Sequence, residues 1–135
     1  IVFTSYGVIG WLPDLKPWAQ MIYDRLKPGG TFYMVEFHPI AWMFDYLQEP
    51  PKMIYGYQQK EAIYEEYEGS YTEDSDTKIV SKEYGWNQAG LTIDYLKEHE
   101  ESPYDIYPDL EKSETGMYVL KDRLYPLVFE IRAHK

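Results

Sequence analysis

The sequence predicts an α/β protein built on a parallel sheet, and three segments near its beginning carry this prediction. Residues 1–5 and 31–37 are apolar runs without the alternation of a half-exposed strand, which is typical of strands covered on both faces. Residues 14–26 place apolar side chains at helical spacing. Strand, helix and strand in this order form a βαβ unit, whose right-handed crossover brings both strand ends to one sheet edge.

The first strand, residues 1–5, leads into a loop at residues 6–12 with glycines at positions 7 and 10. In open α/β sheets, ligands bind beside the loops that follow the carboxyl ends of strands. The G-x-x-G spacing matches neither the Walker loop nor the dinucleotide fingerprint, so no phosphate-binding loop is expected. Position alone makes the following residues candidates for ligand binding: Ser5, Tyr6, Gly7 and Trp11.

Residues 14–26 carry the signals of a helix with one buried face. Asp14 suits the N-cap, and Pro17 is tolerated in the first turn because its missing N–H would have no partner there. Pro28, Gly29 and Gly30 then end the helix and turn the chain into the second strand, residues 31–37. One stripe contains the apolar residues Leu15, Trp18, Ala19, Ile22 and Leu26.

Shorter elements are expected in the rest of the chain. The sequence predicts a helical turn at residues 41–47, a short strand at 53–57, and an antiparallel hairpin of residues 62–71 and 78–86 around a solvated turn. Residues 90–99 have the pattern of an edge strand and 100–115 that of a loop. The final strand is expected at 124–133, with Pro126 where a backbone donor is not needed.

Composition narrows the class of protein. The 135 residues suit one domain with a core. The formal net charge of −10 makes nucleic acid a poor partner, because an acidic surface repels phosphate backbones. The commonest reason for such a net charge is high solubility. The absence of cysteine excludes disulfides and thiolate metal sites and favours a cytoplasmic location. No apolar run approaches the roughly 18 residues of a membrane span, so no membrane partner is expected.

Glu36 and His38 are the candidate catalytic residues, because both lie at the carboxyl end of the second strand. A histidine there could act as a general base. The alternative is that both side chains only bond loop backbone, which is the commoner role of polar residues at strand ends. The other histidines, His99 in an acidic run and His134 near the C-terminus, do not form a cluster typical of a metal site.

Aromatic residues are abundant after the second strand. They have apolar bodies and polar tips, which suit small-molecule pockets, although packing within a lid or a hairpin core is the commoner role. The candidates for lining a substrate pocket are Trp42, Phe44, Tyr64 and Tyr67, with Tyr55 and Tyr57 nearby.

Taken together, the apolar segment 1–5, the aromatic helix, the Leu26-Lys27-Pro28-Gly29-Gly30 turn and the strand ending in Glu36 resemble the second half of a class I S-adenosylmethionine-dependent methyltransferase. The turn is the most specific part of this resemblance. It covers residues 1–38 well and 90–135 loosely, where the last two strands are similar to the antiparallel pair that closes the family's Rossmann-like sheet. Residues 40–87 then correspond to an inserted hairpin lid over the substrate side.

The resemblance implies methyl transfer from S-adenosylmethionine to a small-molecule acceptor, whose identity and nucleophilic atom the sequence does not specify. Enzymatic work of this kind is mostly positioning and desolvation of the two reactants. By the family pattern, the residues after the family's fourth strand contact the methionine end of the cofactor. In this chain those residues are Ser5, Tyr6, Gly7, Val8 and Trp11.

The chain also departs from the family pattern. The Gly-rich loop and the ribose-binding acid would precede Ile1, so we expect residues 1–135 to be a single incomplete domain that is inactive by itself. A helix is expected before the family's sixth strand, which predicts missing residues between Asn87 and Gln88. An apolar first strand without its neighbour would leave an adhesive edge, so a homodimer, a swapped neighbour or a missing N-terminal half is expected to cover it.

Two other functions compete with this interpretation. One is a truncated or degenerate α/β domain that serves binding or assembly without catalysis. The other is a different nucleotide-binding α/β enzyme such as a dehydrogenase. The Lys-Pro-Gly-Gly turn and the closing antiparallel strands weigh against the dehydrogenase.

Overall fold

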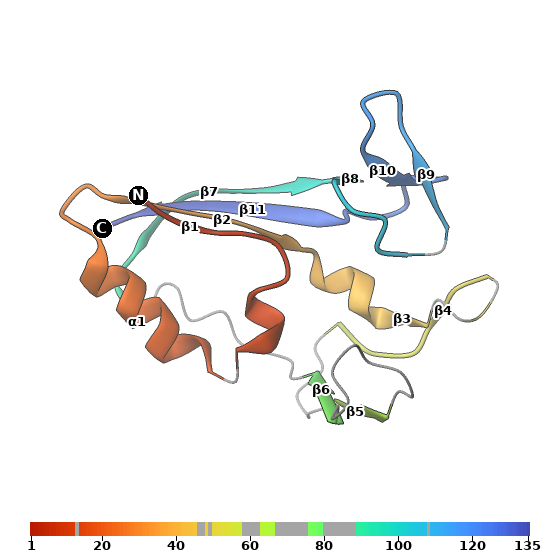
Figure 1. Ribbon diagram of the computed structural model, residues 1–135, viewed down its shortest axis with the longest axis horizontal. Coiled ribbons are helices and arrows are strands. Elements are labelled where there is room, and N and C mark those ends of the chain that lie inside the picture. Colours follow the sequence, from red (N-terminus) through yellow and green to blue (C-terminus); the bar gives the residue numbers. More distant parts are fainter. Residues whose placement is uncertain are drawn as a thin grey trace.

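A mixed four-stranded sheet with one helix against it organises the described part of the chain (Figure 1). The computed structural model describes residues 1–12, 14–45, 48, 50–57, 63–66, 76–79, 89–107 and 109–135, with backbone alone at 11, 63–66 and 76–79. The sheet has the order β1-β2-β11-β7. Its elements are β1 (Val2–Thr4), α1 (Leu15–Arg25), β2 (Thr31–Phe37), β7 (Thr92–His99) and β11 (Val128–His134).

The predicted βαβ unit is confirmed. β1 and β2 pair in parallel, with Val2 opposite Phe32, and α1 connects them. The Asp14 side chain caps the helix by accepting the N–H of Lys16 at 2.9 Å. The apolar stripe of α1 packs on the sheet, where the Trp18 ring meets Phe32 edge-to-face at 6.0 Å between centroids.

The turn at residues 27–30 ends the helix and also holds the far end of β11. Gly30 donates its N–H to the Lys27 carbonyl at 2.7 Å, and Gly29 adopts a φ of +73° that a side chain would disfavour. Gly29 donates to the Lys135 carbonyl at 2.9 Å, and Lys135 donates to the Gly30 carbonyl at 3.2 Å. The turn therefore joins the helix, β2 and the residue that follows β11.

The last two strands of the sheet are antiparallel to their neighbours. β11 lies between β2 and β7, with Val128 opposite both Phe37 and His99. β7 forms an edge, as its sequence pattern predicts. Pro126 lies before β11 rather than inside it, because the strand begins at Val128.

The two faces of the sheet differ in how they are covered. Phe32, Met34 and Ile131 face α1 and form the main core with it. A second cluster, which includes Val35, Val128 and Leu120, lies on the opposite face. The expectation that residues 1–5 are covered on both faces is wrong for the described chain, because Phe3 is 58% exposed on one face while Thr4 is buried on the other. β1 is also an edge strand of this sheet.

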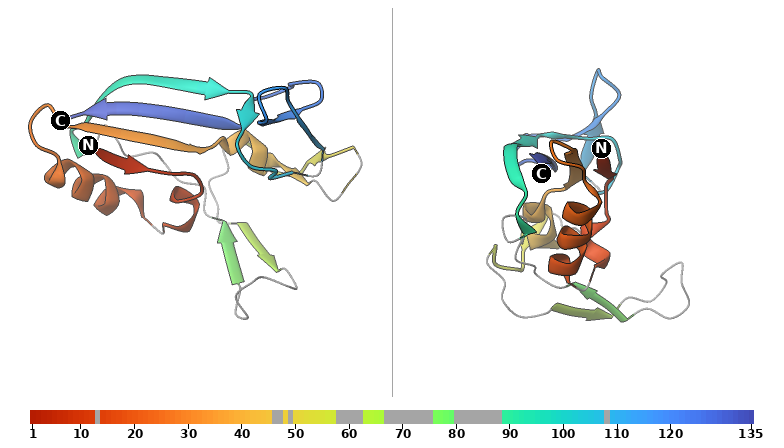
Figure 2. Two further views of the ribbon diagram at one scale, coloured as in Figure 1. Left: turned by 45° about the horizontal axis from the view of Figure 1, so that its top comes forward. Right: turned by 90° about the vertical axis from the view of Figure 1, so that its left-hand side faces the viewer.

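Short elements gather at the end of the sheet where β1 and β2 finish (Figure 2). They are η1 (Ile9–Trp11), η2 (Pro39–Met43), and the antiparallel pair β3 (Phe44–Asp45) and β4 (Lys52–Met53). The predicted hairpin of residues 62–71 and 78–86 is confirmed in part, because β5 (Ile63–Glu66) pairs antiparallel with β6 (Asp76–Ile79), which begins two residues before the predicted second strand. Residues 87 and 88, where missing residues were expected, lie outside the described ranges.

A second small sheet occupies the region after β7. The sequence predicts a loop at residues 100–115, but β8 (Glu101–Ser102) and β9 (Leu110–Lys112) lie within this range, and both pair antiparallel with β10 (Tyr118–Leu120). These strands have only two or three residues each, so the sequence shows no alternation that would predict them. No helix in the described part of the chain is long and apolar enough to cross a membrane.

Candidate functional site

The loop at residues 5–12 follows the carboxyl end of β1 and lies beside the end of β2. The segment after β2 and the small sheet β8-β10-β9 lie at this same end of the molecule (Figure 1). This is the sheet edge at which the parallel order of β1 and β2 predicts a ligand.

The Glu36 carboxylate holds this loop in place by accepting hydrogen bonds from its backbone. Glu36 is 3% exposed, and its Oε2 atom accepts the N–H groups of Val8 at 2.8 Å and Ile9 at 3.1 Å. Its Oε1 atom accepts the N–H groups of Gly7 and, at 2.8 Å, of Phe37. Four backbone donors thus solvate one buried carboxylate, which is how a buried charge is stabilised without water. These contacts match the alternative interpretation, in which the Glu36 side chain only bonds loop backbone.

Gly7 and Tyr6 shape the surface of the loop. Gly7 has a φ of +76°, and a Cβ there would lie 3.6 Å from Phe37 Cε2, so the conformation rather than space favours glycine. The Tyr6 ring lies 5.7 Å from the Phe37 ring and 5.4 Å from the Tyr104 ring. Burial, followed by the neighbouring Tyr104 and Glu130, raises the pKa of Tyr6. Tyr6 is therefore a neutral, well-packed aromatic residue at the edge of the loop.

His38 has both ring nitrogens engaged. Its Nδ1 atom accepts the N–H of Ile40 at 3.2 Å, which places the imidazole proton on Nε2, 3.0 Å from Glu98 Oε1. The side chain is buried against the Phe129 ring, at 6.0 Å between centroids. In this arrangement neither nitrogen is open to a substrate, so the structure favours the structural alternative for His38 over the role of general base.

Two of the predicted lining aromatics, Trp42 and Phe44, have side chains that the structure describes. Trp42 is 52% exposed, and Phe44 stacks on Tyr125 at 5.2 Å between ring centroids. Tyr64 lies in β5, where the structure describes only the backbone, and Trp11 is likewise described without its side chain. Tyr67 lies outside the described residues.

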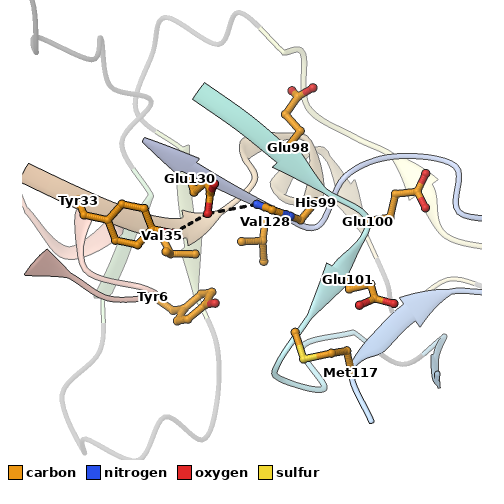
Figure 3. Close-up of a pocket in the computed structure, with 10 residues that line it drawn as sticks. All are labelled: Tyr6, Tyr33, Val35, Glu98, His99, Glu100, Glu101, Met117, Val128 and Glu130. Carbon is orange, nitrogen blue, oxygen red and sulfur yellow. Dashed lines mark hydrogen bonds and ion pairs between the residues drawn. The ribbon is translucent and has the colours of Figure 1, made fainter. Parts of the chain in front are cut away.

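An open hollow of about 470 Å³ lies on the sheet face opposite α1 (Figure 3). Tyr6 links it to the loop, and Val35, Val128 and Glu130 contribute from the sheet. Its rim is acidic, because three glutamates from the end of β7 into β8 line it together with His99: Glu98, Glu100 and Glu101.

Tyr33, His99 and Glu130, which line this hollow, belong to a cluster of titratable side chains that also includes Lys97. Tyr33 donates its hydroxyl to Glu130 Oε2 at 2.5 Å, Lys97 Nζ lies 3.4 Å from Oε1, and His99 Nε2 lies 3.4 Å from Oε2. The Tyr33 hydrogen bond, then Lys97 and His99, lowers the pKa of Glu130 against the effect of burial. The same bond is the largest cause that raises the pKa of Tyr33 to about 12. Glu130 is thus an ionised, ordered carboxylate at neutral pH.

Sequence reasoning missed this cluster and assigned His99 to an acidic surface run. The alternation of Lys97 and His99 along β7 places both on one face, but only the register shows that this face meets Glu130. Within the described ranges, no three histidine, aspartate or glutamate side chains lie close enough to hold a metal ion. Comparisons with protein-family models, curated proteins and solved structures found no match for this chain.

Proposed function

We propose that this chain is part of an S-adenosylmethionine-dependent methyltransferase that acts on a small-molecule acceptor. The observation that carries the proposal is the loop at residues 5–12, which follows β1 of a parallel βαβ unit and is fixed by Glu36. The Lys27–Gly30 turn and the antiparallel pair β11 and β7 support it, because the resemblance in sequence calls for both at these places.

The loop offers groups that fit the methionine end of the cofactor. When bound, S-adenosylmethionine supplies an electrophilic methyl group on a sulfonium centre and carries an ammonium nearby. Ser5 is exposed and the Tyr6 ring is half-buried, so a hydroxyl oxygen and an aromatic face remain at the loop surface. Oxygen atoms and ring faces both attract cations. Gly7, Val8 and Trp11 would contribute backbone to the same site, while Glu36 keeps the loop in place.

Calorimetric titration of the full-length protein with S-adenosylhomocysteine tests the proposal. We expect binding with one ligand per chain, and NAD titrated in parallel should give no heat. Absence of S-adenosylhomocysteine binding at millimolar concentration would exclude the methyltransferase, and binding of NAD alone would favour the dehydrogenase.

A binding or assembly module without catalysis is the second candidate. It is favoured by the open edge at β1, where Ile1 is 96% exposed and Phe3 is 58% exposed. Such an edge can pair with a strand of a second copy, and a homodimer through β1 is the simplest form of this. A stable monomer of residues 1–135 in size-exclusion chromatography would count against it.

A further inference from the structure

We propose that His99 is the general base of the methyl transfer, and that Glu130 and Tyr33 position it. This role rests on the proposed methyltransferase function. It goes beyond that function by naming the group that takes the acceptor's proton, and it assigns the role to a different histidine from the one the sequence favours.

The geometry at His99 leaves one nitrogen for the acceptor. Its Nε2 atom lies 3.4 Å from Glu130 Oε2, and Figure 3 shows the ring beside Glu130 at the hollow. A proton on Nε2 facing the carboxylate leaves the lone pair on Nδ1. The side chain is 42% exposed, so a small molecule in the hollow can reach the ring. His38, in contrast, has both nitrogens bonded within the protein.

Glu130 is built to hold the imidazole in this state. Its side chain is 13% exposed, and it is fixed by the Tyr33 hydroxyl at 2.5 Å and by Lys97 at 3.4 Å. An ordered carboxylate that faces Nε2 fixes the tautomer and stabilises the imidazolium that forms when Nδ1 accepts a proton. Tyr33 therefore acts through Glu130, and Glu130 acts through His99.

Other charged and titratable groups lie around His99 at the hollow. Glu98, Glu100 and Glu101 line the hollow beside His99 from the end of β7 and from β8. Glu100 pairs with Arg123 at 2.8 Å, and Lys97 is the cation nearest to Glu130. Tyr6 and Tyr33, the other titratable residues of the hollow, both have raised pKa values and are neutral near pH 7.

The reaction then balances without a further reagent. The lone pair of an acceptor N–H or O–H group attacks the methyl carbon, and the new bond forms as the carbon–sulfur bond breaks with its electron pair remaining on sulfur. The acceptor's proton passes to Nδ1 of His99, and the imidazolium returns it to water after the product leaves. Tyr6 belongs both to the loop and to the hollow, so the donor and the acceptor would meet at that residue.

Methyl transfer to a panel of small amines, phenols and carboxylic acids tests this role in the full-length protein, with S-adenosylmethionine labelled in its methyl group. We expect His99→Gln to lower the rate by about 100-fold or more, as loss of a general base does, without changing the affinity for S-adenosylhomocysteine. Glu130→Gln should lower the rate about 10-fold and alter its pH profile. The matched control is His134→Gln, which removes another exposed histidine paired with a carboxylate, Asp94 at 2.7 Å.

The outcomes separate the two levels of the proposal. A protein that does not bind S-adenosylhomocysteine refutes the methyltransferase itself, whereas one that binds it and keeps its rate in His99→Gln refutes only the role of His99. If no compound of the panel is methylated, nitrogen NMR of labelled histidine decides. A proton on Nε2 that depends on Glu130 supports the role, and a proton on Nδ1 in the wild type overturns it.

Discussion

Four backbone N–H groups converge on the Glu36 carboxylate, and three of them come from consecutive residues of one loop. Successive N–H groups that point into one concavity form an anion-binding arrangement. In this protein the anion is a side chain of the neighbouring strand. The loop at residues 5–12 therefore has its conformation fixed before any ligand arrives, and the residue that fixes it does not itself have to touch the ligand.

We expect Glu36→Gln to lower the free energy of unfolding by about 1–3 kcal/mol, because an amide presents donors to donors and leaves buried N–H groups unpaired. Urea denaturation measures the loss, and hydrogen exchange should show faster exchange at Gly7, Val8 and Ile9. Glu111→Gln, at an exposed position of β9, is the control and should change neither quantity. Unchanged exchange in Glu36→Gln would show that the loop is held by other contacts.

Gly7→Ala and Gly10→Ala test the loop conformation with a matched pair. At Gly7 the φ of +76° should cost alanine about 1–2 kcal/mol of stability, and affinity for S-adenosylhomocysteine should fall with it. A Cβ at Gly10 meets nothing within 4 Å and φ is not positive, so that variant should retain both. Equal effects of the two substitutions in thermal denaturation and calorimetry would contradict this expectation.

At the scale of elements, strand pairing assembles the cluster of titratable side chains around Glu130. β2 supplies Tyr33, β11 supplies Glu130 and β7 supplies Lys97 and His99, and the antiparallel registers bring them into one cluster. None of these strands carries the cluster alone. The strand β2 spans the predicted residues 31–37. The Tyr33 hydroxyl of this strand nevertheless donates its hydrogen bond to Glu130, which lies 97 residues further along the chain.

The charge of Glu130 makes the free energy of unfolding decrease as the pH is lowered into the acid range. Because the pKa of Glu130 is lower in the folded protein, the unfolded chain takes up the proton first as the pH falls. The stabilisation is therefore complete at neutral pH, above the unfolded pKa, and is lost as the pH falls through the folded pKa. Urea denaturation across the acid range should show a steeper loss in the wild type than in Glu130→Gln. Glu111→Gln should retain the wild-type slope.

At the scale of the whole molecule, the two chain ends lie together at one end of the sheet and the candidate site lies at the other (Figures 1 and 2). Between them, β1 leaves one lateral edge of the sheet open, with Phe3 stacked on Tyr33 at 5.9 Å between ring centroids. Additional chain can therefore join the sheet at β1 without disturbing the loop, the hollow or the turn at residues 27–30.

Phe3→Lys is expected to reduce self-association of residues 1–135, because a charge on an edge strand opposes pairing with another edge. Analytical ultracentrifugation at increasing protein concentration measures the association. Leu124→Lys is the control, since Leu124 is also a highly exposed apolar residue, at 74%, but lies outside the strands. Association that both substitutions weaken equally would point to general stickiness rather than pairing at β1.

The sequence predicts the βαβ unit and the closing strands well because their signals are local: Asp14 caps α1, the 27–30 turn ends it, and the apolar runs mark β2 and β11. The small sheet β8-β10-β9 was missed because strands of two or three residues have no period to detect. The structural role of Glu36 and the contact of His99 with Glu130 depend on residues about 30 positions apart, and only the fold brings those together.

The place of β11 in the middle of the sheet bears on how the protein is made. The ribosome releases β2 and β7 before β11, which is the strand that pairs with both of them. Neither β2 nor β7 can pair on that side until β11 (Val128–His134) has emerged. Until then a nascent chain carries two strands with unpaired edges, which are surfaces that invite aggregation and chaperone binding. A premature stop codon ahead of residue 128 would leave the chain in that state permanently.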